Sequence, residues 1–520
     1  MNENKSIYTR ENNAHFINVM QADGVYVKET LIQSEFYDES TANHNSEAIA
    51  EIMKTAPPKC TIYFPGGMYH FNGAADSGRA VIVSSGEMQS FAGDGINATF
   101  IREKSRDTET FFLMAHGHCS ISDMSITSAD MAEAYTVEWE NEPHKTAVTF
   151  DCSKAPNLFT AGCILQNLVI NSTGNDIIRT SYHRPFETAV KVRGNWLDTY
   201  CHTMWMTDVF TGFDVAEKWV GGALMGGPIR IINVHSYASN GDSGKKQRWN
   251  TFFKSEGAIM EQIEILNCMY IGSQFIRIDS AVGEDRKPSY DMVIDHNYIN
   301  TVWIDAGSDE TKSGIYINLP VIDGQYSRDI RFTNNSCTGR SPGDGAFFYV
   351  KGAVRGVTFA DNDVSSGGAD KCVYIRSTEA ADGTDTGIRD VKIYGNYFRN
   401  YKNPITVGGD SKAKDDFYID RVIVMGNQTM NEAAVERIGK VGINLSRCRS
   451  VTLTGNTLCP TLGYALTMYG CERAAVSGNI FEGFDTDTPG EVGIWLKECK
   501  DIALGTNVMH GFKKNIEQTD

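Results

Sequence analysis

Two aspartates, Asp279 and Asp305, end short segments of one pattern, IRID and VWID, in which apolar and polar residues alternate. The two residues are 26 positions apart, close to the length of the repeat described below. On neighbouring strands of a solenoid their carboxylates would lie about 5 Å apart. That separation suits the nucleophile and the acid of a retaining glycosidase, and like charges so close favour one protonated acid beside one ionised base. We predict that Asp279 and Asp305 form a catalytic pair.

Cations occupy the equivalent position in neighbouring segments, namely Lys254 in TFFK, Lys351 in FYVK and Arg376 in VYIR. Flanking the aspartates, these side chains could hold an acidic sugar. Two alternatives stay open for the whole column of charges. It could be a salt-bridge ladder on a solvated strand face, or its paired carboxylates could bind Ca²⁺. The sequence otherwise predicts no cofactor, because it has no phosphate-binding or zinc-binding motif.

Tryptophans supply further substrate-binding candidates, since an aromatic ring can stack on a sugar. Trp303 lies inside the VWID segment, and Trp249 lies on the polar stretch 240–257. The alternative for Trp249 is a loop that buries one aromatic residue as an anchor.

A second acidic cluster, Asp208, Asp214 and Glu217, lies in TDVFTGFDVAEKW. Trp205 and Trp219 are near it in sequence, and a glycine-rich segment, GGALMGG, follows. Together these residues could form a platform for a sugar. The alternative is an ordinary turn with buried aromatic residues.

A repeated asparagine indicates which elements must position these candidates. It closes β-like segments such as VTFADN and VTLTGN, and its clearest copies are Asn297, Asn335, Asn362, Asn396, Asn427, Asn456, Asn479 and Asn507. Successive copies are 38, 27, 34, 31, 29, 23 and 28 residues apart, a period typical of repeat architectures. The segments alternate and show no helical period, which predicts the coils of a parallel β-helix.

Each asparagine is expected at a sharp corner between two strands, where this residue type tolerates the left-handed conformation. Stacked coils would align the side-chain amides about 4.8 Å apart in a hydrogen-bonded ladder. Apolar residues at alternate positions, such as Val391 and Ile393, should point inward. Less regular coils are expected earlier in the chain, which gives about thirteen coils in all. These earlier coils are placed at 121–128, 165–172, 204–212, 229–236 and 263–270.

Composition bounds the possible partners. The 520 residues carry a formal net charge of −17 with no basic stretch, which argues against nucleic acid. No run is apolar enough for a membrane span, and the first residues lack the apolar core of a signal peptide. Twelve cysteines form no CxxC pair. They are therefore expected to be reduced residues of a protein made in the cytoplasm, whether cytoplasmic or released in a virion.

The N-terminal region carries a family resemblance. Residues 44–54, HNSEAIAEIMK, predict a short amphipathic helix, and residues 60–71, CTIYFPGGMYHF, predict two strands around a turn. This combination resembles the opening of the pectate-lyase superfamily, which includes many phage tailspikes. The resemblance implies an all-β, single-stranded right-handed parallel β-helix, pectin-lyase-like, whose open end the helix covers.

The expected organisation has four parts. Residues 1–40 form an irregular arm and possible attachment segment, 41–110 a cap with the first coils, 111–512 the β-helix, and 513–520 a tail. VWID echoes the VWIDH motif of pectate lyases, but Ala306 replaces the histidine, so that lyase site is doubtful. The GHG and RIK motifs of polygalacturonases are absent as a set.

The favoured interpretation is a glycan-recognising and glycan-cleaving protein that resembles a phage tailspike depolymerase. It implies a poly- or oligosaccharide partner, a homotrimer, and a virion or tail partner bound through residues 1–40. One alternative is an intracellular bacterial carbohydrate-active enzyme, which could be a glycosidase, a polysaccharide lyase or a fructan-anhydride enzyme. The other is a non-catalytic, glycan-binding structural spike. The sequence does not distinguish hydrolysis from β-elimination, because Lys351 and Arg376 could serve a lyase.

Overall fold

The protein is described here from a computed structural model, and its chain divides into two compact units, 1–254 and 255–520. The structure describes residues 12–519 apart from short internal segments. These segments are 76–77, 105–107, 129–130, 133–144, 152–159, 172–181, 184–185, 194–195, 208, 217–226, 238–248, 258–259, 282–287, 302–306, 323, 340–341, 367–369, 379–386, 410–418, 432–438 and 485–488.

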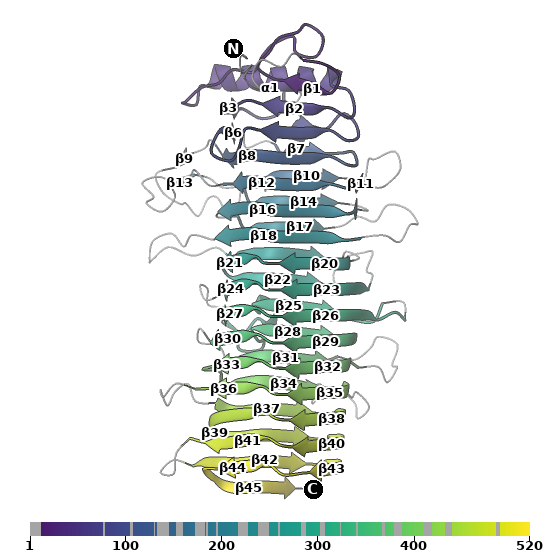
Figure 1. Ribbon diagram of the computed structural model, residues 1–520, viewed down its shortest axis with the longest axis vertical. Helices are drawn as coiled ribbons and strands as arrows, with labels where there is room; N and C mark the ends of the chain where they lie inside the picture. The colour runs from purple at the N-terminus through teal and green to yellow at the C-terminus, as the bar shows by residue number, and fades with distance from the viewer. Residues whose placement is uncertain are drawn as a thin grey trace, which may run out of the picture. The chain divides into compact units, whose positions relative to one another are not determined.

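The second unit consists of parallel strands that pair in register from coil to coil, so the predicted parallel β-helix is confirmed (Figure 1). Its first sheet contains β22 (Gln274–Asp279), β25 (Ile315–Leu319), β28 (Phe348–Gly352), β31 (Lys371–Ser377), β34 (Asn403–Gly409), β37 (Gly439–Ser446), β39 (Thr457–Tyr469), β42 (Gly490–Lys497) and β45 (Phe512–Thr519). Each strand contributes one rung, and side chains at matched positions form columns along the sheet.

Two further sheets complete the coils of this unit. The second sheet contains β20 (Met260–Leu266), β23 (Ser289–Asp295), β26 (Ser327–Thr333), β29 (Val354–Ala360), β32 (Arg389–Tyr394), β35 (Ile419–Met425), β38 (Cys448–Thr454), β40 (Glu472–Ser477) and β43 (Lys500–Leu504). The third contains β21 (Met269–Ile271), β24 (Tyr298–Thr301), β27 (Ser336–Gly339), β30 (Asp363–Ser366), β33 (Tyr397–Arg399), β36 (Gln428–Met430), β41 (Ile480–Gly483) and β44 (Val508–His510), with β39 running through both this sheet and the first.

The core of the second unit lies between these sheets and is built from stacked columns of apolar side chains. Val391 and Ile393 are fully buried, as their alternation predicts. Phe359 stacks on Phe332 with ring centroids 5.2 Å apart, and on Phe398 at 6.2 Å. Identical side chains on neighbouring rungs therefore pack face to face, which fixes the register of the strands.

The predicted asparagine ladder is present at all eight positions, between the second and third sheets. The side-chain amide of each of the first seven donates to the Oδ1 atom of the asparagine one coil further on, at 2.9–3.1 Å. The same oxygen accepts the backbone N–H of the donor residue, at 2.9–3.2 Å. Because these groups are buried in most coils, the ladder satisfies main-chain and side-chain polar atoms that would otherwise lack partners.

One detail of the corner differs from the prediction. The ladder asparagines themselves do not adopt the left-handed conformation; the residue before each of the first seven does. Glycine, asparagine or aspartate fills most of these preceding positions, because such residues tolerate a positive φ. The preceding residues are His296, Asn334, Asp361, Gly395, Gly426, Gly455 and Gly478.

The first unit begins with α1 (Glu39–Thr55), which covers β3 (Gly67–Phe71) and β4 (Ala80–Val83). The helix starts earlier than the predicted residue 44, because the Asp38 carboxylate accepts the Thr41 N–H at 2.8 Å and caps it. Its buried face includes Ala48, Ile49, Ile52 and Met53, as predicted.

Parallel sheets follow the helix within the first unit. One contains β2 (Thr61–Phe64), β5 (Ser90–Gly93), β8 (Ser120–Ser128), β12 (Ile164–Ile170), β16 (Thr199–Thr207) and β18 (Ile229–Tyr237). Another contains β4, β7 (Thr110–Met114), β10 (Thr146–Asp151), β14 (Thr188–Arg193) and β17 (Thr211–Ala216). A third, short one pairs β3 with β6 (Thr99–Glu103) and β6 with β8. The coils expected at 121–128, 165–172 and 229–236 thus fall on β8, β12 and β18.

Both ends of the chain are more regular than expected. Within the predicted arm, β1 (Phe16–Asn18) pairs in parallel with β2. The predicted tail belongs to β45, which pairs with β42 and forms the last rung of the first sheet. In each case a short segment continues the backbone hydrogen bonds of its neighbour and so covers an edge that would otherwise be open.

Eleven cysteines are free thiols in the structure, and Cys152 lies outside the described residues. The described part of the chain contains no helix with the length and apolar character that a bilayer crossing requires.

Candidate functional site

The column of charges predicted from sequence, apart from Lys254, lies on the first sheet of the second unit, with one correction. Asp279 is opposite Asn318, and Asn318 is opposite Lys351. Lys351 is in turn opposite Arg376. The neighbour of Asp279 in the column is therefore Asn318 and not Asp305. The spacing along the sequence predicted the wrong neighbour because the next strand of the sheet begins only at Ile315.

Asp279 has little access to solvent. Its side chain is buried, and its Oδ1 atom accepts hydrogen bonds from Asn318 Nδ2 at 2.9 Å and from the Ala281 N–H at 3.1 Å. Asp305 and Trp303 lie outside the described residues, as do Asp208 and Glu217. The catalytic pairing of Asp279 with Asp305 accordingly stays a prediction.

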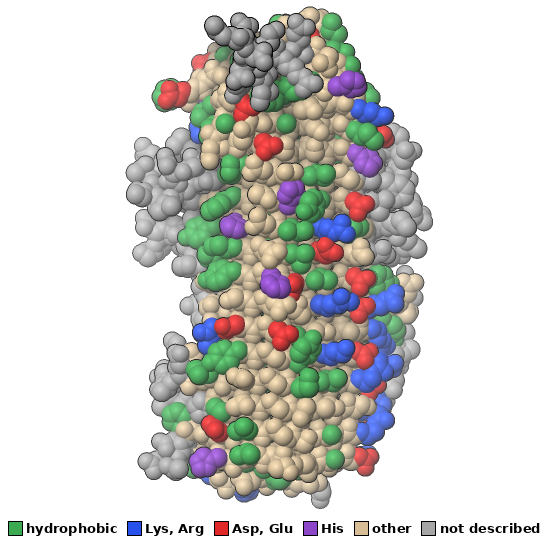
Figure 2. All heavy atoms as spheres, in the orientation of Figure 1, with side chains coloured by type: hydrophobic (Ala, Val, Ile, Leu, Met, Phe, Trp, Pro, Cys, Tyr) green, Lys and Arg blue, Asp and Glu red, His purple; other side chains and the backbone are tan. Residues whose placement is uncertain are grey.

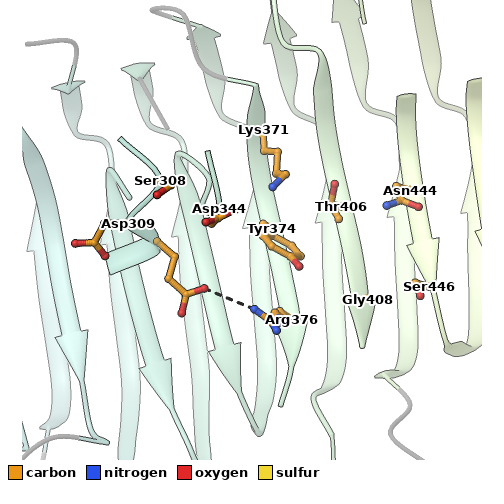
Figure 3. Close-up of a pocket in the computed structure, with 11 residues that line it drawn as sticks. Ser308, Asp309, Asp344, Lys371, Tyr374, Arg376, Thr406, Gly408, Asn444 and Ser446 are labelled. Atoms are coloured by element: carbon orange, nitrogen blue, oxygen red, sulfur yellow. Dashed lines mark ion pairs between the residues drawn. The ribbon is translucent and has the colours of Figure 1, made fainter. Parts of the chain in front are cut away.

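Beside this column the structure contains a polar groove of about 690 Å³ (Figure 3). The groove runs across three rungs, β31, β34 and β37, and loop residues before β25 and β28 line one side of it. We call it the groove. Its lining residues are Ser308, Asp309, Glu310, Asp344, Lys371, Tyr374, Arg376, Thr406, Gly408, Asn444 and Ser446.

Glu310 is the best-positioned carboxylate of the groove. It lies on a 3-10 turn, η4 (Glu310–Lys312), which Asp309 caps by accepting the Thr311 N–H at 3.0 Å. The Glu310 carboxylate accepts from Lys351 Nζ at 2.5 Å, and Arg376 Nη1 lies 3.6 Å away. The loop thus places an acid over the two cations that the sequence predicts.

A tyrosine hydroxyl completes the environment of Glu310. Tyr349 Oη donates to the carboxylate at 3.0 Å, and Arg376 Nη1 donates to the same hydroxyl at 3.4 Å. Burial raises the pKa of Tyr349 well above its usual range, so the hydroxyl keeps its proton and remains a donor. Two cations and one neutral donor therefore surround the Glu310 carboxylate and fix its orientation.

The floor of the groove is a column of side chains on successive rungs, Tyr374, Thr406 and Asn444, which lie opposite one another in turn. The column continues to Tyr349, which lies opposite Tyr374 but is fully buried and does not line the groove. The Tyr374 ring stacks on that of Tyr349 at 4.9 Å, and Lys371 Nζ lies 5.2 Å from the Tyr374 centroid. Figure 3 shows Tyr374, Thr406 and Asn444 on successive strands of the same face. Hydrogen-bonding groups thus recur at the rung spacing of about 4.8 Å.

The remaining described candidates lie in the first unit. Asp214 on β17 forms an ion pair with Arg193 at 3.5 Å and lies opposite Lys191. Burial, followed by the charge of Arg193 and more weakly that of Lys254, lowers the pKa of Lys191. Asp214 and Lys254 therefore belong to a half-buried charged cluster. Trp249 is half-buried just before β19 (Thr251–Glu256).

Trp205, named above as part of a sugar platform, is exposed on β16. Its side chain is 52% exposed, and its ring lies 5.4 Å from that of His235 on the next strand. An exposed tryptophan on a rigid strand can stack on a sugar. Trp219 lies outside the described residues.

Sequence reasoning found Lys351 and Arg376 but missed Glu310. The repeat locates residues on the strands, whereas Glu310 lies on a loop that interrupts one coil. The signal available was the long gap of 38 residues between Asn297 and Asn335, which marks an insertion in this coil. Among the described residues, no group of three or more histidine, cysteine or acidic side chains could hold a metal ion.

No protein family matches the sequence, and no curated protein matches it either. Structure comparison finds similar chains. The surface adhesin PfbA of Streptococcus pneumoniae has 12% identity and a TM-score of 0.43, over 94% of this chain and 98% of that one. The A-module of the mannuronan C-5 epimerase AlgE6 of Azotobacter vinelandii has 13% identity and a TM-score of 0.40, over 96% and 99%. The tailspike of E. coli bacteriophage HK620 has 9% identity and a TM-score of 0.41, over 97% and 81%. Because these values are low, the function argued next depends on the residues of this chain alone.

Proposed function

We propose that this protein binds a polysaccharide along the groove and cleaves it there. The observation that carries the proposal is the column of polar and aromatic side chains, one per rung, beside a carboxylate held by two cations. An extended polymer fits a surface whose binding groups repeat at a constant interval. Tyr374 offers a ring face, and Thr406, Asn444 and Ser446 offer hydroxyl and amide groups that suit sugar hydroxyls.

Glycoside hydrolysis needs a second carboxyl group besides that of Glu310. The groove supplies Asp309 and Asp344. Asp309 Oδ1 is used by the turn, where it accepts the Thr311 N–H and hydroxyl, whereas Asp344 is exposed at the rim. We therefore assign Glu310 as the first carboxyl group of the reaction and Asp344 as the second. This choice differs from the predicted pair of Asp279 and Asp305 and competes with it experimentally.

A non-catalytic, glycan-binding role is the second candidate, and one observation favours it. Glu310 already accepts from Lys351 and Tyr349 and lies near Arg376. A carboxylate so fully bonded is a weaker nucleophile than a free one, and it could serve only to hold the two cations in place for binding. Binding without product release would identify this role.

The test is an incubation of the full-length protein with bacterial capsules, O-antigens, pectin, alginate and fructans. New reducing ends report hydrolysis, and ultraviolet absorbance of an unsaturated uronate reports elimination. We expect reducing ends without absorbance, and a loss of about 100-fold or more in Glu310→Gln and Asp344→Asn. The matched control is Glu491→Gln, an exposed acid paired with Lys513.

Three outcomes separate the candidates. Full activity in Glu310→Gln, with loss in both Asp279→Asn and Asp305→Asn, would move the site to the predicted aspartate pair. Absorbance would reassign the reaction to a lyase. A tailspike-like role further predicts a homotrimer, which sedimentation equilibrium measures, whereas an intracellular enzyme should prefer oligosaccharides to whole cells.

A further inference from the structure

Arginines are stacked in register on the second sheet of the second unit. Arg328 on β26 is opposite Arg355 on β29, and Arg355 is opposite Arg389 on β32. Arg331 and Lys392 project from the same strands and are exposed. We call these five residues the arginine strip. Like charges directly opposite one another on a sheet are destabilising, so the fold retains the strip at a cost in stability.

Figure 2 shows Lys and Arg side chains gathered along the right-hand side of the view, where Figure 1 places β26, β29 and β32. These three strands carry five cations but only two carboxylates, Asp329 and Asp390. Asp390 is already bound by Arg421, at 2.5 and 2.6 Å. Within the described ranges, no residue of the strip has a carboxylate at ion-pair distance, although Asp420 on β35 (Ile419–Met425) lies opposite Arg389, and the charges of Lys392 and Arg355 help to lower the pKa of Asp390. The strip therefore carries a local positive charge on a chain whose net charge is −17.

The head group of Arg355 is held in place. Its guanidinium carbon lies 3.8 Å from the centroid of Tyr326, and Nη1 donates to the Gly387 carbonyl at 2.7 Å. Arg328 lies 4.9 Å from the centroid of Tyr290 in a similar contact. Burial, followed by the charge of Arg389, lowers the pKa of Arg355, which shows how closely the cations are packed. Fixed guanidinium groups lose little entropy when they bind an anion.

We propose that the arginine strip is a binding site for an anionic polysaccharide, whose carboxylate or sulfate groups bridge neighbouring rungs. The stacked guanidinium groups repeat at about 4.8 Å along the sheet, comparable to the advance of one sugar residue in an extended chain. Planar guanidinium groups also match carboxylate and sulfate geometry by paired hydrogen bonds. A bound anion would relieve the repulsion between Arg328, Arg355 and Arg389.

Nucleic acid is a less suitable ligand for this site. One face of Tyr326 is covered by Arg355 and one face of Tyr290 by Arg328, so these faces cannot stack on bases. The strip also lies on a different sheet from the groove, so its ligand need not be cleaved, and the inference stands apart from the function proposed above.

The experiment measures binding of three oligosaccharides of equal length to the full-length protein by calorimetry. The probes are a heparin fragment for sulfate, an oligogalacturonate for carboxylate, and a dextran fragment as the neutral reference. The test variant is Arg328→Gln/Arg355→Gln/Arg389→Gln. The charge-matched control is Arg79→Gln/Arg399→Gln/Lys513→Gln, because these three exposed cations are each paired with an acid. Circular dichroism confirms that both variants fold.

We expect at least one anionic probe to bind more tightly than dextran and to weaken as salt is raised. The strip variant should lose about tenfold or more in affinity, and the control should lose little. If one anionic probe binds more tightly than the other, its charged group, sulfate or carboxylate, is the one that the strip recognises. Equal loss in both variants, no anionic probe better than dextran, or equally tight binding of a single-stranded oligonucleotide would each overturn the proposal. Glu310→Gln should bind the anionic probe as tightly as the wild type does. Failure of the proposal for the groove can therefore be distinguished from failure of the proposal for the strip.

Discussion

Cations on two sheets of the same unit have opposite surroundings. On the first sheet, Lys351 and Arg376 are bound to Glu310, and their side chains are 19% and 26% exposed. On the second sheet, Arg328 and Arg355 lie opposite each other, and no carboxylate among the described residues lies within ion-pair distance of either. Both pairs occupy neighbouring rungs of the same solenoid. The architecture therefore does not decide whether a charge is satisfied; the loops between the strands do.

This difference separates two uses of charge. In the groove, the cations are paired inside the protein, where they hold the Glu310 carboxylate in one orientation. On the strip, charges remain available to an external anion. Glu310 reaches its cations because one coil contains an inserted turn before β25, whereas the described segments beside β26, β29 and β32 place no acid over the strip.

The largest predicted effect comes from breaking the asparagine ladder, which closes the corner between the second and third sheets. Asn396→Ala removes amide bonds to Asn427 Oδ1 and the Phe359 carbonyl, and it leaves the Asn362 N–H without its acceptor. Because these groups are buried, we expect the free energy of unfolding to fall by about 3–5 kcal/mol. Both binding functions should then weaken together. Chemical denaturation measures the change.

The control for the corner is Asn507→Ala, at the last rung. Asn507 is only partly buried, so water can replace its bonds to the Val476 and Gly505 carbonyls. The loss should be much smaller than at Asn396. Equal losses at the two positions would show that the ladder contributes through chain entropy and not through buried hydrogen bonds.

The second effect concerns Glu103 and Lys145 in the first unit, where the acidic side chain is buried. Glu103 is 2% exposed. Its carboxyl group accepts a hydrogen bond from the Thr108 hydroxyl, and its Oε1 atom lies 3.7 Å from Lys145 Nζ. Burial raises the pKa of Glu103 to about 7, although Lys145 opposes the shift. The unfolded chain releases this proton near pH 4.3. Stability should therefore fall as pH rises from about 4.3 to 7, by about 3 kcal/mol.

Glu103→Gln tests this sign, because the amide cannot ionise. The variant should lose the decline in unfolding free energy between pH 5 and pH 8, and Glu109→Gln, an exposed acid paired with Arg79, should keep the wild-type profile. A wild-type protein that becomes more stable over this interval would show that Lys145 outweighs burial and keeps Glu103 ionised.

The third effect concerns the groove directly. Glu310→Ala leaves Lys351 and Arg376 without a counter-charge in a half-buried site, and we expect a loss of about 2 kcal/mol. Glu310→Ala/Lys351→Met should recover part of it, because one of the stranded cations is removed as well. Denaturant midpoints of the wild type, the two single variants and the double variant give the coupling. A coupling energy near zero would mean that the ion pair between Glu310 and Lys351 positions these side chains without stabilising the fold.

Strand positions could be predicted from the sequence because they repeat. Eight asparagines at similar spacing located the corners, and alternation placed Val391 and Ile393 in the core. The same regularity put Lys351 and Arg376 on one face. It did not show that Asn318 follows Asp279 in the column, and it could not find Glu310, because loop residues obey no period. The arginine strip was visible in the sequence as SRDIR, VRG and RDVK, but only the register shows that Arg328, Arg355 and Arg389 are stacked.

The smallest effect distinguishes the strip from the groove. Arg328→Gln removes a like-charged neighbour of Arg355 and an exposed contact with Tyr290. Losing the repulsion stabilises the fold, whereas losing the contact with Tyr290 destabilises it. The unfolding free energy should therefore change by less than about 0.5 kcal/mol. Stability measured at low and at high salt separates the terms: repulsion within the strip predicts that salt stabilises the wild type more than Arg328→Gln. An identical salt response in the two proteins would mean that Arg328 is already neutralised, and the contrast between the two sheets would then disappear.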